Sequence, residues 1–147
     1  MNKQSLIGAS FSHMLTIGLF FASGLAIGQE CTRPPSQTAV EFLRDFETAP
    51  RPEVVREIYE RNISRDRRFT LQQFEDLRRE VVGRFGARPE KTVREPDILR
   101  INAFTAGNVK GTEITLLASY PNGRVTQITR LVCERGSWKV FAFEFRP

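Results

Sequence analysis

The side chains that could do acid-base chemistry in this chain are carboxylates and phenols. The 147 residues contain a single histidine, His13, which lies in the apolar N-terminal segment. Without that segment the usual general base, the Ser-His and Cys-His nucleophile pairs and most zinc or copper sites are lost. Tyr59, Tyr120, Asp97 and Glu113 remain as polar candidates, and none of them falls in a recognisable catalytic motif.

A histidine-free enzyme would need a carboxyl group whose pKa is raised by burial. Asp97, Glu113 and Glu144 are the candidates, and one of them would have to point into a dry cavity. No cluster of carboxylates has the spacing of metal ligands. We therefore predict no catalytic residue, no metal and no cofactor.

Two cysteines, Cys31 and Cys133, remain outside the N-terminal segment. In an oxidising compartment two cysteines allow one intramolecular disulfide. Closing a loop of about 100 residues contributes up to about 4.7 kcal/mol in the chain-entropy model. We expect the Cys31–Cys133 bridge; unpaired or intermolecular thiols are the alternative. A redox pair is not expected, because there is no Cys-x-x-Cys sequence.

The N-terminus is typical of a secretory signal peptide, which we assign to residues 1–28. Lys3 precedes the apolar stretch Met14–Gly28, which ends in small residues. The alternative is an uncleaved membrane anchor, since Ser5 to Gly28 exceeds the roughly 20 residues that span a bilayer. The protein would contact a membrane only in that second case.

The remainder, residues 29–147, has the usual size of one domain. The formal net charge is +5 and comes mostly from arginine, with the densest run at Arg61–Arg68. Basic runs bind nucleic acid, anionic lipid or acidic partners. An exported protein rarely meets nucleic acid, so we predict no such partner and interpret the run as a solvated, salt-bridged helix end.

Three amphipathic helices are predicted before residue 87. The two prolines of Cys31–Pro35 favour an extended lead-in, after which Ser36 or Thr38 caps a helix that ends at Ala49 and is stopped by Pro50. Pro52 opens the second helix. Thr70 and Gln73 form a capping box for the third, which ends at Gly86.

Antiparallel strands are predicted after the helices. A short strand is placed at Thr92–Val93 and a longer one at Ile98–Phe104. The stretch from Gly111 to Phe145 reads as a three-stranded meander with two-residue turns at Asn122–Gly123 and Arg135–Gly136.

These turns assign the side chains of the meander to two faces. Tyr120 would lie opposite Val125 on the first face, and Cys133 opposite Trp138. The second face would carry Arg130 among apolar residues: Leu117, Ile128, Val132, Phe141, Phe143 and Phe145. Helices would cover the first face. The second face would be a pocket wall, a dimer interface or a surface covered by the N-terminal arm.

The order of elements resembles the nuclear-transport-factor-2-like superfamily of α+β cones. The helix containing Leu77–Gly86 and the closing segment Arg135–Phe141 are most similar to small exported bacterial proteins of unknown function. The resemblance covers residues 37–145. It implies an α+β fold in which three N-terminal helices pack on a curved antiparallel sheet of about four strands. Together with the leader it indicates a bacterial periplasmic location, and an uncleaved leader would instead anchor the protein in the inner membrane.

We expect an exported, non-enzymatic domain that binds a small amphipathic ligand or a protein partner through the concave sheet face. Arg130, Phe141, Phe143, Leu117 and Ile128 are the predicted ligand-binding residues. One alternative is a module for homodimerisation or cell-envelope assembly. The other is a histidine-free acid-base enzyme resembling the isomerases and dehydratases of the superfamily, which use an Asp, Tyr or His inside the cone.

Overall fold

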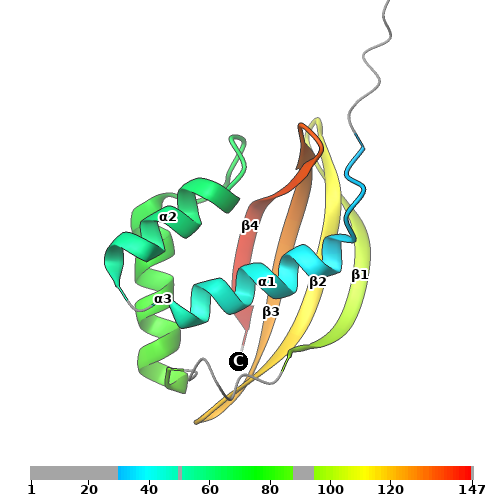
Figure 1. Cartoon of the computed structure of the whole chain (residues 1–147). Helices are drawn as coiled ribbons and strands as arrows, with labels where there is room; N and C mark the ends of the chain where they lie inside the picture. Colours follow the sequence, from blue (N-terminus) through cyan, green and yellow to red (C-terminus); the bar gives the residue numbers. More distant parts are fainter. Residues whose placement is uncertain (1–29, 50, 88–94, 147) are drawn as a thin grey trace, which may run out of the picture.

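Three helices precede a four-stranded sheet, so the chain has the expected α+β arrangement (Figure 1). The computed structural model describes residues 30–49, 51–87 and 95–146. The helices are α1 (Pro35–Thr48), α2 (Pro52–Asn62) and α3 (Leu71–Phe85). The strands are β1 (Asp97–Ala106), β2 (Val109–Tyr120), β3 (Gly123–Glu134) and β4 (Ser137–Arg146).

Three expectations lie outside the described residues: the signal peptide at residues 1–28, the helix stop at Pro50 and the short strand at Thr92–Val93. Among the helices that are described, none is long and apolar enough to cross a membrane.

The helix ends follow local sequence signals. Thr70 and Gln73 form the predicted capping box of α3, and Gly86 ends that helix at a φ of 85°. The expected extended lead-in through Pro35 and the cap at Ser36 or Thr38 were wrong: α1 begins at Pro35, its N-cap is Pro34, and no side chain caps it. Proline is tolerated at the first helical position because the N–H that it lacks has no intrahelical partner there.

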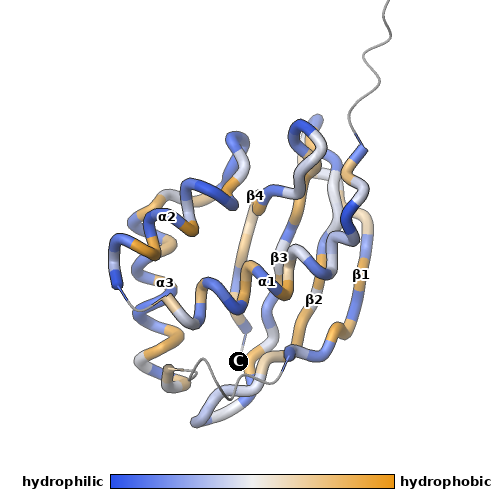
Figure 2. Tube along the Cα trace, in the orientation of Figure 1, coloured by the Kyte–Doolittle hydropathy of each residue, from blue (hydrophilic) through white to orange (hydrophobic). Residues whose placement is uncertain are grey.

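The sheet is an antiparallel meander in the order β1-β2-β3-β4, and α1 lies across one of its faces (Figure 1). The buried side chains of that covered face are those assigned from the sequence to the first face: Ile114, Leu116, Ala118, Tyr120, Val125, Gln127, Thr129 and Leu131. The apolar positions of α1, α2 and α3 turn towards this face and form one core with it (Figure 2).

The first turn of the meander lies at Pro121–Asn122, because Tyr120 pairs with Gly123. The predicted turn at Asn122–Gly123 was therefore wrong. Proline fixes φ near −65° and favours the second position of a type I turn, which favours glycine at its fourth position. The register is shifted by two residues, so Ala118 rather than Tyr120 lies opposite Val125. A two-residue shift leaves every side chain on its predicted face.

The second turn is at Arg135–Gly136, as predicted, with φ of 51° and 78°. Cys133 pairs with Trp138, also as predicted. Beyond Val140 the pairing shifts at a β-bulge, where Phe141 is the extra residue, and Phe143 pairs with Thr129. The bulge returns Phe143 and Phe145 to the helix-covered face, so their predicted place on the face of Arg130 was wrong.

An aromatic cluster joins the helices to β4. The Phe143 ring lies 4.9 Å from that of Phe42 and 5.0 Å from that of Phe46, centroid to centroid, and both contacts are edge-on. Phe46 also contacts Phe74 of α3 at 5.1 Å and Phe145 at 5.5 Å. Edge-on aromatic pairs add about 0.5–1.5 kcal/mol beyond the area that they bury.

The N-terminal arm is fastened to the β3–β4 hairpin. Cys31 and Cys133 form the expected disulfide, with 5.8 Å between their Cα atoms. Arg33 lies two residues after Cys31, and its carbonyl oxygen accepts a hydrogen bond from the indole N–H of Trp138 at 2.7 Å. A disulfide of this kind fits an oxidising, exported location.

Gly111 of β2 occupies a position at which no other residue fits. A Cβ atom there would collide with the carbonyl oxygen of Leu131 and lie 2.5 Å from the ring of Phe104. Phe104 pairs with Gly111 across β1 and β2, and its ring reaches the ring of Phe141 on β4 at 5.7 Å. Gly111 thus lets an aromatic side chain cross the uncovered face of the sheet.

We predict that Gly111→Ala destabilises the fold by about 3 kcal/mol, because the new methyl group must displace strand backbone as well as a ring. Gly83→Ala is the matched control: a Cβ atom added at Gly83 would meet nothing within 4 Å, and alanine favours a helix by about 1 kcal/mol. Urea unfolding of both variants measures the difference. Equal stabilities would contradict the close approach at Gly111.

Candidate functional site

A shallow hollow lies on the sheet face that α1 leaves uncovered. Its volume is about 430 Å³. Two of the predicted ligand-binding residues, Arg130 and Phe141, line it. The other lining residues come from β1, β2, β4 and the α2–α3 connection: Arg68, Phe104, Thr105, Ala106, Glu113 and Ala142. We call this site the Arg130 hollow.

Arg130 is held in a cross-strand charge network. Its Nε donates to Glu113 on β2 at 2.7 Å, and its Nη2 lies 3.6 Å from Glu144 on β4. Arg146 bonds the same Glu144 carboxylate at 3.0 Å. Two carboxylates already surround the guanidinium of Arg130. Arg130 therefore holds these carboxylates in place and does not offer a free charge to a ligand.

Arg68 supplies the second cation of the hollow and comes from the α2–α3 connection. Its backbone N–H donates to the carbonyl oxygen of Phe141 at 2.9 Å, which fixes the connection to the edge of β4. Its guanidinium lies 5.2 Å from the centre of the Phe141 ring. Among the described residues Arg68 has no carboxylate partner, so its charge is available to a ligand.

The aromatic floor of the hollow is made by two stacked rings. Phe141 is only 3% exposed, because Phe104 and Arg68 cover it. Phe104 is half-buried and is therefore the ring that a ligand can touch. The hollow thus combines one accessible aromatic surface with one unpaired cation.

The other predicted ligand-binding residues do not reach the hollow. Leu117 and Ile128 lie on the same face, opposite Thr126 and Thr115, but they are not among its lining residues. Phe143 lies in the core on the opposite face.

The carboxylates proposed for acid-base chemistry are not enclosed in a dry cavity. The Asp97 side chain is 51% exposed and lies 3.6 Å from Arg124. Glu113 and Glu144 are partly exposed and both bond Arg130. The Tyr59 hydroxyl donates to the carbonyl oxygen of Phe69 at 3.0 Å. Within the described residues, no three acidic, histidine or cysteine side chains are grouped as a metal site would need.

One buried acidic residue was missed from the sequence. Glu47 of α1 is 3% exposed and accepts a hydrogen bond from the hydroxyl of Tyr120, which is 7% exposed. The signal was its spacing: Glu47 follows Leu43 by four residues and so falls on the apolar stripe of α1. The pair links α1 to β2 within the core.

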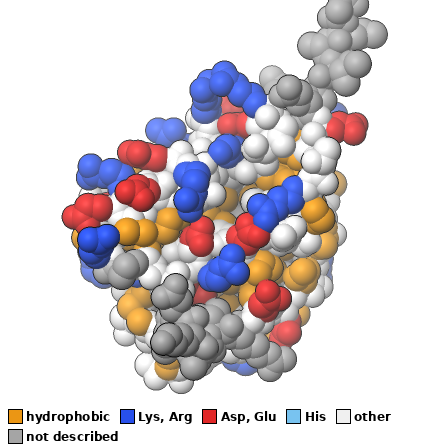
Figure 3. Space-filling view, viewed as in Figure 1, with side chains coloured by type: hydrophobic (Ala, Val, Ile, Leu, Met, Phe, Trp, Pro, Cys, Tyr) orange, Lys and Arg blue, Asp and Glu red, His pale blue; other side chains and the backbone are white. Residues whose placement is uncertain are grey.

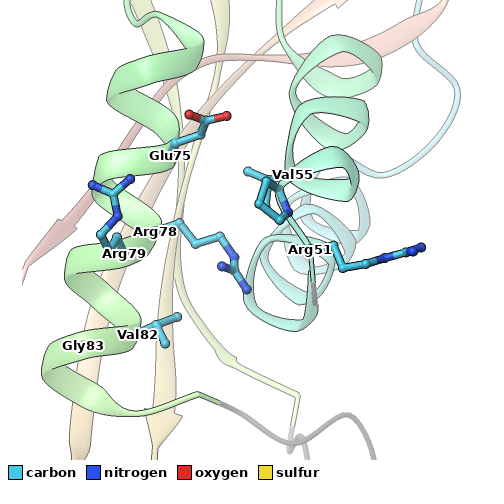
Figure 4. A pocket seen from close by; sticks show the side chains of 8 residues that line it. Arg51, Val55, Glu75, Arg78, Arg79, Val82 and Gly83 are labelled. Carbon is cyan, nitrogen blue, oxygen red and sulfur yellow. The ribbon is translucent and has the colours of Figure 1, made fainter.

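A second cavity, of about 410 Å³, opens between the start of α2 and the middle of α3 (Figure 4). Arg78 points from α3 into the space between the helices, whereas Arg51 extends away from α3. Arg78 donates to the carbonyl oxygen of Phe46 at 2.9 Å and to that of Ala49. Burial lowers the pKa of Arg78 from its ordinary value.

These contacts give Arg78 a structural role. The last carbonyl groups of a helix have no intrahelical partner, and a cation near them is favoured by the helix dipole. Arg78 satisfies two such groups at the end of α1 and so ties α1 to α3. The guanidinium of Arg78 already donates to these carbonyl groups, and we do not assign a ligand to this cavity.

We predict that Arg78→Met destabilises the protein by about 2 kcal/mol, because two carbonyl groups at the end of α1 lose their charged donor. The neighbouring Arg79→Met is the control. Arg79 is exposed and bonds only Asp76 on its own helix, so its loss should cost less than about 0.5 kcal/mol. Thermal unfolding of the two variants distinguishes them; similar losses would argue against the cap.

Comparison of the chain with protein-family models, with curated proteins and with solved structures finds no match. The resemblance to the nuclear-transport-factor-2-like superfamily therefore stays a prediction. Any function has to be argued from the geometry described above.

Proposed function

We propose that this protein is an exported, non-enzymatic binding domain that takes a small anionic amphipathic molecule in the Arg130 hollow. The bacterial periplasm is the proposed location, and the nuclear-transport-factor-2-like cone is the proposed family. One observation carries the proposal. Arg68, a cation without a carboxylate partner among the described residues, and the accessible ring of Phe104 line the same cavity.

The charges around the hollow favour an anion with a single negative group. The Glu113 and Glu144 carboxylates balance Arg130 and Arg146, which leaves the charge of Arg68 uncompensated. An arginine guanidinium binds planar carboxylate, sulfonate or phosphate groups through two donors. The Phe104 ring then receives the apolar part of the same molecule.

Arg130 is one of the ligand-binding residues predicted from the sequence, and its guanidinium bonds Glu113 at 2.7 Å. We propose that Arg130 instead keeps those carboxylates away from the ligand. Loss of Arg130 would then weaken anion binding indirectly, by releasing negative charge beside the hollow.

Anilinonaphthalene sulfonate is a suitable probe, since it carries one sulfonate on an aromatic body. We predict that the full-length protein binds one probe molecule, and that Arg68→Gln weakens binding about tenfold, which corresponds to about 1.4 kcal/mol. Arg130→Leu should weaken it as well. Fluorescence titration at constant ionic strength measures both affinities.

Arg124→Gln is the matched control, because Arg124 is exposed at the far end of β3 and bonds Asp97. It should leave probe affinity unchanged. Native mass spectrometry of the protein purified from its own envelope fraction should also detect a co-purifying small molecule as added mass. Equal affinity of the Arg68→Gln variant and the parent protein would refute the proposed role of the hollow.

A second candidate function, dimerisation, is favoured by the outer strand β1. Ile98, Leu99 and Ile101 are 49%, 54% and 52% exposed, although each is large and apolar. The edge of β4 is partly paired with the α2–α3 connection through Ile63 and Ser64, whereas β1 has no such cover among the described residues. Long apolar edge strands favour pairing with another chain.

If β1 pairs between two copies, Ile101→Lys should convert a dimer into a monomer by placing a charge in the contact. Gln37→Lys adds the same charge at an exposed site on α1 and should leave the dimer intact. Sedimentation velocity at tens of micromolar measures both. A monomeric parent protein under those conditions would remove this candidate and leave the hollow untouched.

A further inference from the structure

Two short segments carry most of the net charge of the chain. Residues 61–68 contain four arginines and one aspartate, and residues 133–139 contain Arg135 and Lys139 against Glu134. Together they hold six cations and two carboxylates, a net charge of +4, while the whole chain carries +5. Their spatial relation therefore decides where the positive charge of the molecule lies.

The two segments meet at the point where the chain enters the domain. The backbone N–H of Ser64 donates to the carbonyl oxygen of Val140 at 2.8 Å, and its hydroxyl donates to Glu134. Lys139 Nζ donates to the carbonyl oxygen of Arg61 at 2.5 Å. The disulfide joins Cys31 to the same hairpin. We call residues 31–33, 61–68 and 133–139 the tether pole.

Figure 1 shows the α2–α3 connection and the β3–β4 turn at the same end of the molecule as the start of α1. In the space-filling view blue side chains lie at that end with red ones beside them (Figure 3). Glu60, Asp66 and Glu134 line the same depression as Arg65, Arg135 and Lys139. Within residues 61–68 and 133–139 the cations outnumber the carboxylates by six to two.

Several cations of the pole are free to meet a partner. Arg65, Arg67 and Arg135 are exposed, and none of them has a carboxylate partner among the described residues. The guanidinium of Arg67 lies over the Tyr59 ring, 5.7 Å from its centre. Glu134 is already occupied, since it accepts hydrogen bonds from Ser64 and from the backbone of Arg65. The expected salt-bridged helix end holds only for Arg61, which bonds Asp45.

The chain leading into the pole identifies the partner. The apolar stretch Met14–Gly28 ends three residues before Cys31. Three residues span at most about 10 Å, which is close to the Debye length of about 8 Å at physiological salt. If the leader is uncleaved and lies in a membrane, the tether pole is held near the lipid headgroups.

We infer that the tether pole is a docking surface for an anionic lipid membrane. Clustered arginines next to an apolar segment are attracted to acidic headgroups, by about fivefold in binding for each cation near the surface. The surface shares Arg68 with the Arg130 hollow, but Arg65, Arg67 and Arg135 do not line the hollow, so the two proposals can be tested separately.

The experiment mixes the full-length protein with vesicles of phosphatidylcholine alone, or of equal parts phosphatidylcholine and phosphatidylglycerol. Sedimentation measures the bound fraction, and Trp138, the single tryptophan of the chain, gives a fluorescence signal from the pole itself. The apolar N-terminal stretch contributes to binding on both vesicles. The ratio of the two partition coefficients therefore isolates the effect of headgroup charge.

The parent protein should prefer the anionic vesicles, and the preference should fall as salt is raised. The triple variant Arg65→Gln, Arg67→Gln and Arg135→Gln should lower the ratio about 100-fold. The control triple Arg51→Gln, Arg56→Gln and Arg100→Gln removes the same charge from exposed sites outside the pole and should change the ratio only slightly. Circular dichroism establishes that both variants fold.

Two results would overturn the inference. One is a parent protein that shows no preference for anionic vesicles, even if it binds soluble polyphosphate. The other is an equal loss in the two triple variants, which would mean that net charge rather than the tether pole determines binding.

Discussion

The β-bulge at Phe141 is the constraint on which both faces of the sheet depend. Without the extra residue, Phe141, Phe143 and Phe145 would project from one side of β4. With it, Phe143 and Phe145 turn towards the helices and complete the aromatic core, while Phe141 remains on the uncovered side beneath Phe104. The bulge also presents the carbonyl oxygens of Val140 and Phe141 to the α2–α3 connection. One inserted residue therefore determines the core, the hollow and the position of Arg68.

Local signals in the sequence predicted the elements, and the tight contacts between strands changed the details. The capping box at Thr70 and the turn at Arg135–Gly136 depend on neighbouring residues alone, and both were predicted. The first turn moved to Pro121–Asn122 because the fixed φ of proline outweighed the preference of Asn-Gly for a turn with positive φ. Face assignments survived because that shift was an even number of residues. The bulge has no local signature, so strict alternation misplaced Phe143.

The candidate site was predictable only where its residues share a strand or a register. Arg130 and Phe141 were grouped from the meander pattern and do meet at the hollow. Arg68 was not found, because it reaches the hollow from a connection more than 60 residues earlier in the chain than its Arg130 neighbour. Glu47 had a readable signal in its spacing from Leu43, yet its hydrogen bond to Tyr120 joins elements 73 residues apart. Contacts of this kind follow from the fold and cannot be read from spacing.

The arginines of this protein fall into two groups that differ in what their charge does. Arg130 and Arg78 are fully engaged, with carboxylates across strands and with carbonyl groups at a helix end, so they contribute to the fold. Arg67 and Arg68 lie over aromatic rings instead, which holds the guanidinium in place without neutralising it. A stacked arginine keeps its donors for an outside anion and loses little freedom when one binds. Arg67 and Arg68 both belong to the α2–α3 connection. That connection therefore presents charge both to the hollow and to the tether pole, and backbone hydrogen bonds attach it to Val140 and Phe141 at the bulge in β4.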